Sequence, residues 1–133
     1  QIFILGFLNS IPLDWYSRRF VDKHLSFFIF ESLTIPKFDY NDPKVKRIIE
    51  ITANLSFKEV DIFDLQKKLK IKLRKINDNE RNSMIAELDC LTGILYGLND
   101  KDLSHIFETY RVGWDFDERL NKVKSYYKLW NKK

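Results

Sequence analysis

The sequence predicts a mainly α-helical domain with a short strand remnant at its N-terminus. After residue 40, three stretches pair a helix-capping side chain with apolar residues at helical spacing, and a fourth shows the spacing alone. At the N-terminus, Ile2-Phe3-Ile4-Leu5 is an uninterrupted apolar run that we interpret as a strand. A single strand has nothing to pair with, so we expect the chain to be a fragment of a larger protein.

The first predicted helix begins at Pro43. Asp42 supplies a capping carboxylate, and proline suits the first helical position because its missing N–H is not needed there. Its apolar residues recur at the spacing of one helix face: Val45, Ile48, Ile51 and Leu55.

Two capping boxes predict the next two helices. Asn77 with Glu80 begins a helix that ends at Gly97, and Asn99 with Asp102 begins another. The connection is so short that these helices must pack as neighbours. The first has a stripe of Met84, Leu88, Leu91 and Leu95, and the second a face of Leu103, Ile106, Phe107 and Tyr110.

A last helix is expected from about Asp117. Its apolar side comprises Phe116, Leu120, Val123, Tyr127 and Trp130. The segment from Asp61 to Ile76 is ambiguous, because its apolar residues fit helical spacing in one half and alternate like a strand in the other. We favour a helix there.

Composition predicts a globular protein. The chain has 133 residues, of which 44% are hydrophobic and 32% charged. The longest apolar run, from Ile2 to Leu8, is far shorter than the roughly 20 residues of a membrane-spanning helix. We therefore expect a cytoplasmic protein with no membrane partner. We interpret Cys90, which lies within a helical pattern, as a buried thiol.

The domain division follows from the predicted elements. Residues 1–38 are expected to form an N-terminal unit with a strand, a helix and an aromatic segment. Residues 39–133 are expected to form a C-terminal helical bundle. The connection from Lys37 to Asn41 is the expected link between them.

Signals for catalysis are sparse. The two histidines, His24 and His105, are far apart in the sequence, and paired cysteines are absent, so we expect no metal site. The four glycines are too dispersed for a phosphate-binding loop. We therefore assign no catalytic residue to this chain.

Basic and polar side chains near the N-terminus are the main functional candidates. A short aromatic helix is followed by Arg18 and Arg19, and then by Lys23 and His24. Guanidinium groups at a helix end can hold DNA phosphates or a guanine edge, and His24 and Asn9 can add hydrogen bonds. These five residues are the predicted DNA-binding site.

Structural alternatives stay open for each candidate. In the structural alternative for Asn9, this residue only caps a helix, and in that for His24, the histidine has a structural role. In the alternative for Arg18 and Arg19, either arginine pairs with a nearby carboxylate. The carboxylates in question are Asp14, Asp22 and Glu31. A second basic run, residues 67–75, holds six basic residues and is more often a solvated face than a phosphate contact.

Two groups of motifs stand out in the sequence. The N-terminal group comprises Leu8-Asn9-Ser10, Arg18-Arg19, His24-Leu25-Ser26-Phe27-Phe28-Ile29 and Leu33-Thr34-Ile35-Pro36. The tail group comprises Ala86-Glu87-Leu88-Asp89-Cys90-Leu91, Leu95-Tyr96-Gly97-Leu98-Asn99, Asp102-Leu103 and Ile106-Phe107-Glu108-Thr109. The first group resembles the end of the target-recognition domain in large adenine-specific DNA methyltransferases from restriction-modification and phage-defence systems, and the second resembles the tail of the same family. The family commonly has an LNS segment, an arginine, an HL-aromatic segment and a proline-containing end, followed by a helical tail. The resemblance therefore implies that residues 1–38 form the end of a target-recognition domain.

This resemblance implies that DNA recognition and methyl transfer lie in different parts of the parent protein. The family transfers methyl from S-adenosylmethionine to a flipped adenine at an Asn/Asp-Pro-Pro-Tyr/Phe motif. This sequence has no Pro-Pro pair. The expected function is thus non-catalytic recognition of double-stranded DNA, with no cofactor bound by the fragment. The parent protein would bind S-adenosylmethionine and supply the remaining domains.

A helical scaffold or protein-interaction module is the alternative function. In that case large aromatic side chains would anchor an interface with another domain or a partner. The candidate anchors are Trp15, Tyr16, Trp114 and Trp130.

Overall fold

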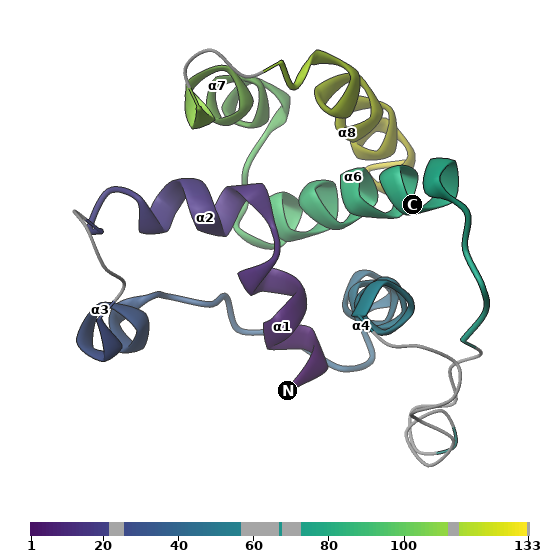
Figure 1. Ribbon diagram of the computed structural model, residues 1–133, viewed down its shortest axis with the longest axis horizontal. Coiled ribbons are helices and arrows are strands. Elements are labelled where there is room, and N and C mark those ends of the chain that lie inside the picture. Colours follow the sequence, from purple (N-terminus) through teal and green to yellow (C-terminus); the bar gives the residue numbers. More distant parts are fainter. Residues whose placement is uncertain (22–25, 57–66, 68–72, 112–114, 133) are drawn as a thin grey trace.

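The computed structural model describes residues 1–21, 26–56, 67, 73–111 and 115–132, except for the side chain of Ile29 (Figure 1). Within these ranges the fold is all-helical, and no strand occurs. None of these helices is long and apolar enough to cross a membrane. The helices are α1 (Ile2–Leu8), α2 (Ile11–Ser17), α3 (Phe27–Ser32), α4 (Pro43–Ser56), α6 (Asp78–Leu95), α7 (Asp100–Tyr110) and α8 (Asp117–Trp130).

The expected N-terminal strand is wrong, because residues 2–8 form α1. Phe3, Gly6 and Phe7 lie on one buried helical face, while Ile4 and Leu8 are exposed. An uninterrupted apolar run carries no periodicity, so the sequence alone cannot separate a strand from a helix. Packing against α4 selects the helix.

Gly6 permits a close approach between α1 and α4. A Cβ atom at this position would lie 2.5 Å from Thr52 Oγ1 and 2.9 Å from Ile48 Cγ2. Both distances are shorter than ordinary van der Waals contact. A larger residue at position 6 would therefore push the two helices apart.

The four predicted C-terminal helices are confirmed as α4, α6, α7 and α8. The side chains of Asn77 and Asn99 close both expected capping boxes. Asp42 Oδ1 accepts a hydrogen bond of 2.8 Å from the Lys44 backbone N–H at the start of α4. These local bonds satisfy N–H groups that have no partner within the helix.

Gly97 separates α6 from α7, as predicted. Its φ of 78° lies in the left-handed region that favours glycine. The backbone then turns back, and the Leu98 N–H donates to the Gly93 carbonyl at 3.0 Å. This cap stops α6 and allows α7 to begin at Asp100.

Helix α6 is the centre of the fold. In Figure 1 it crosses the middle of the molecule, with α7 and α8 on one side and α1 and α4 on the other. It contributes to two hydrophobic clusters. The first joins α6 to α1 and α4, through Phe3, Phe7, Ile48, Leu88 and Leu91 among others. The second joins α6 to α7 and α8, through Ala86, Cys90, Leu103, Phe107 and Val123 among others.

Helix α3 stands apart from these clusters, at the end of an extended segment (Figure 1). The segment packs through Leu33, Ile35 and Phe38 against the first cluster, and Tyr96 Oη donates to the Thr34 carbonyl at 2.8 Å. The predicted non-helical connection at 37–41 is confirmed.

Two predictions about the organisation of the chain stay open. The helix favoured between Asp61 and Ile76 falls almost entirely outside the described residues, although 73–77 have no regular element. The division into 1–38 and 39–133 also stays a prediction. Side chains from both parts share the first cluster.

Two buried carboxylates on α6 connect it to three other helices. Glu87 accepts a bidentate pair of hydrogen bonds from Arg47 on α4, at 3.1 and 2.7 Å, and a third from Trp130 Nε1 at 3.2 Å. Asp89, which is fully buried, accepts from the Ile11 backbone N–H at 2.8 Å and from Arg119 Nε at 2.6 Å. Each acid therefore fixes elements from distant parts of the chain.

Replacing Asp89 with alanine should destabilise the fold by about 3 kcal/mol, because the half-buried Arg119 would lose its charged partner and the buried Ile11 N–H would lose its acceptor. Urea unfolding measures this loss. Glu118→Ala is the control, since it removes an acid paired only at the surface with Lys122. An Asp89→Leu/Arg119→Met double variant should lose less than Asp89→Ala. A single-variant effect no larger than that of the control would contradict the role of Asp89.

Candidate nucleic-acid interface

Helix α2 carries the predicted arginines to the surface. Ser10 begins the helix in an extended conformation, and Ile11, Pro12 and Leu13 are buried. The helix ends at Ser17, so that Arg18 and the residue after it lie in an exposed turn. The sequence prediction of a short helix ending in guanidinium groups is confirmed.

Arg18 is held by contacts with two side chains. Its Nη2 donates to Asp14 Oδ2 at 3.0 Å, and its guanidinium carbon lies 5.2 Å from the centre of the Tyr110 ring. The hydroxyl of Tyr110 donates to the same carboxylate oxygen. The hydrogen bond that Arg18 donates to Asp14 raises the pKa of Arg18, while burial and the hydrogen bond to Asp14 raise the pKa of Tyr110. The carboxylate alternative is therefore confirmed for Arg18.

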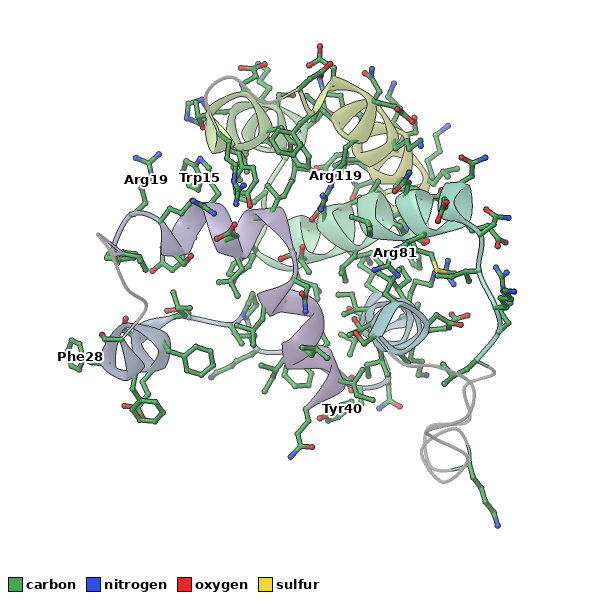
Figure 2. All side chains as sticks on the ribbon, viewed as in Figure 1. Trp15, Arg19, Phe28, Tyr40, Arg81 and Arg119 are labelled. Atoms are coloured by element: carbon green, nitrogen blue, oxygen red, sulfur yellow. The ribbon has the colours of Figure 1, made fainter. Side chains whose placement is uncertain are left out.

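Arg19 lies over an aromatic ring. Its guanidinium carbon is 4.3 Å from the centre of the Trp15 ring, and within the described residues no acidic side chain pairs with it. Figure 2 shows the two side chains together on the outer side of α2. Stacking on tryptophan orients the guanidinium and leaves its edge open to solvent.

Trp15 is itself fixed by α7. Its indole N–H donates to Thr109 Oγ1 at 2.9 Å, and its ring meets the His105 ring edge-on at 6.2 Å between centres. The Thr109 hydroxyl in turn donates to the His105 carbonyl at 2.7 Å. The platform under Arg19 is thus held by two helices.

Arg111 is a functional candidate that the sequence analysis missed. Its guanidinium carbon lies 5.4 Å from the centre of the Tyr110 ring. No local pattern links it to Arg18, because the fold alone brings the end of α7 to the end of α2. We define the arginine–aromatic surface as Trp15, Arg18, Arg19, Tyr110 and Arg111.

Asn9 lies next to this surface but is used structurally. It ends α1, and its Nδ2 donates to the Leu5 carbonyl at 2.8 Å. A cavity of about 330 Å³ extends from Asn9 to Tyr110 and Arg111. The other two predicted site residues, Lys23 and His24, lie outside the described residues.

A second exposed surface is formed by phenylalanines. On α3, Phe27 and Phe28 expose 74% and 81% of their surface, and Phe20 and Phe30 are also exposed. Phe28 points away from the rest of the molecule in Figure 2.

An apolar groove of about 290 Å³ lies between α2 and the α6–α7 turn, where Trp15 and Tyr16 form part of its wall.

The other aromatic candidates have different environments. Trp130 is half-buried and donates to Glu87, which makes it part of the scaffold. Trp114 lies outside the described residues. Of the predicted interface anchors, Trp15 and Tyr16 therefore line an accessible groove.

The described residues offer little support for metal or thiol chemistry. In the described part of the chain, no group of three or more histidine, cysteine or acidic residues could hold a metal ion. Cys90 is buried, as predicted. Burial, together with the charges of Glu87 and Asp89, raises the pKa of its thiol to about 12.

Comparison with protein-family models, with curated proteins and with solved structures found no match for this chain.

The buried environment of Cys90 predicts low thiol reactivity in the folded protein. At pH 8 its thiolate population should be roughly a thousandfold below that of an ordinary cysteine. We therefore expect very slow reaction with a thiol reagent such as 5,5′-dithiobis-(2-nitrobenzoic acid) in the folded protein. The same protein in urea, as a control, should react fully. Rapid stoichiometric labelling of the folded protein would contradict this prediction.

Proposed function

We propose that this chain is a non-catalytic DNA-recognition and scaffold segment of an adenine-specific DNA methyltransferase. The observation that carries the DNA contact is the arginine–aromatic surface. Three guanidinium groups share it, and each lies over a tryptophan or tyrosine ring. Arginine side chains oriented in this way can donate to phosphate oxygens or to a guanine edge with little loss of side-chain entropy on binding.

The three arginines have different roles in this proposal. Asp14 neutralises the charge of Arg18 and also binds the Tyr110 hydroxyl, so Arg18 mainly helps to keep Tyr110 in place on the surface. Arg19 has no acidic partner in the described part of the chain and is the strongest candidate for a DNA contact. Arg111 extends the surface towards α7. Lys23 and His24 complete the proposed site.

The scaffold role rests on the buried ion pairs of α6. Asp89 fixes the first turn of α2 through the Ile11 N–H, and α7 fixes Trp15 through Thr109. The helix that carries Arg18 and Arg19 at its end is therefore fixed in position before DNA binds. Preorganisation of this kind lowers the entropic cost of binding.

The methyltransferase assignment rests on the resemblance in sequence. In this proposal the parent protein binds S-adenosylmethionine and carries the Pro-Pro motif, neither of which belongs to the present segment. The parent's remaining domains and double-stranded DNA are the proposed partners.

Replacing Arg19 with glutamine should weaken binding to a short duplex about 5- to 10-fold at roughly 0.1 M salt, because one phosphate contact is lost. If Arg19 contacts a phosphate, the loss should be similar for unrelated sequences, and the slope of log affinity against log salt should fall by about 1. Fluorescence anisotropy with a labelled duplex measures both quantities.

Lys46→Gln is a matched control for charge, since Lys46 is an exposed residue of α4, outside the arginine–aromatic surface. It should bind DNA almost as the unmodified chain does. Equal affinities for the Arg19 variant and the unmodified chain would overturn the assignment of Arg19. Absence of salt-dependent DNA binding by the unmodified chain would overturn the proposed function.

The phenylalanines of α3 favour a second candidate function, as a contact surface for another domain or protein. Exposed apolar patches of this kind are typical of interaction sites. Phe27 and Phe28 are the most exposed large apolar side chains in the described part of the chain. An aromatic contact of this type would depend weakly on salt, in contrast to DNA binding.

A Phe27→Ser/Phe28→Ser double variant separates the two functions. Because both rings are exposed, the free energy of unfolding should change by no more than about 0.5 kcal/mol. Binding of a hydrophobic dye should fall, while DNA affinity should stay unchanged. Phe3→Ser, which alters a buried ring, is the destabilising control. A loss of DNA affinity equal to that of Arg19→Gln would instead place α3 in the DNA surface.

A further inference from the structure

A small polar pocket lies where four helices meet, separate from the outer side of α2. Its volume is about 220 Å³. Its walls come from the end of α1, the last turn of α4, one side of α6 and the start of α8. The lining residues are Asn9, Thr52, Leu55, Ser56, Arg81, Ile85, Leu88 and Arg119.

Two arginines line this pocket, and none of its lining residues is acidic. Arg119 uses its Nε to bind Asp89, and within the described residues its two Nη groups have no hydrogen-bond partner. Arg81 is exposed, and its Nη1 lies 3.5 Å from the Leu55 carbonyl, a long and weak contact. Both guanidinium groups therefore keep donors for a ligand (Figure 2).

Thr52 adds a buried hydroxyl to the same lining. The residue is 2% exposed, and its Oγ1 is buried without a hydrogen-bond partner in the described part of the chain. A buried polar group without a partner is costly, and such groups are rare in folded proteins. This oxygen lies close to Gly6 of α1, where an added Cβ atom would come within 2.5 Å of it, so Thr52 lines the pocket without offering its hydroxyl to a ligand.

We propose that this pocket binds a phosphate group. The donors are the guanidinium groups of Arg81 on α6 and Arg119 on α8, and a phosphate has enough acceptor oxygens to bind both. Arg81 supplies positive charge, and the Arg119–Asp89 ion pair holds the second guanidinium in place.

Phosphate could come from a nucleic-acid backbone or from a small phosphorylated molecule. The proposal concerns the chemistry that both share, and it does not depend on the arginine–aromatic surface. Arg81 and Thr52 contribute to the pocket and not to that surface. The two proposals can therefore fail independently.

Titration with sodium phosphate, followed by ¹H–¹⁵N NMR against sodium chloride at equal ionic strength, tests the site. We expect saturable shifts of amides at the ends of α1 and α4. Arg81→Gln should weaken phosphate binding at least fivefold. Lys46→Gln is the charge control that should bind phosphate as the unmodified chain does. Thr52→Val conserves side-chain shape and removes a hydroxyl that the pocket does not reach, so it should also leave phosphate binding unchanged.

Three results would overturn the proposal: no saturable shifts beyond those of chloride, unchanged phosphate affinity in the Arg81 variant, or acetate binding as tightly as phosphate. A duplex DNA competition identifies the source. Displacement of phosphate from the pocket by DNA supports a backbone phosphate, and retention supports a small phosphorylated ligand. Arg19→Gln should leave phosphate binding unchanged, which distinguishes this site from the proposed DNA surface.

Discussion

The fold depends on two carboxylates that a central helix carries into the protein interior. Glu87 and Asp89 are two residues apart on α6, so they point in different directions, and each meets an arginine from another helix. Burial raises the pKa of Asp89 even though the charge of Arg119 and the Ile11 N–H both lower it. Desolvation therefore outweighs the attraction, as is common for buried ion pairs. The value of these pairs lies in specificity, because an arrangement of helices that left either acid unpaired would be strongly disfavoured.

This constraint explains how a short helix can present a defined surface. Helix α2 has only seven residues, too few to be stable alone. Asp89 binds its first backbone N–H, and its buried residues Ile11 and Leu13 belong to the two different clusters. Trp15 then connects its outer side to α7. The positions of the arginines are thus determined by tertiary contacts at both ends of α2.

Signals that are local in sequence predicted the C-terminal helices well. A capping asparagine and the acidic residue three positions later interact within one turn, so Asn77 and Asn99 show where α6 and α7 begin. The stripe predicted for α6 is only part of its buried surface, because Glu87 and Asp89 are charged residues whose burial depends on distant arginines. Helix α1 was missed because an apolar run has no period. For the candidate site, the sequence predicted Arg18 and Arg19 at a helix end, whereas the approach of Arg18 to Tyr110, and so to the neighbouring Arg111, could not be predicted without the fold.

Shape contributes more to the proposed DNA surface than charge does. The chain has a net charge of only +4, and Asp14 compensates one of the three arginines. A surface of this kind has weak long-range attraction for DNA, so affinity must come from a few well-oriented donors. The rings of Trp15 and Tyr110 provide that orientation, because each holds a guanidinium against a face that the protein has already fixed. In the proposed parent enzyme, other domains would supply most of the binding energy, and this segment would contribute position.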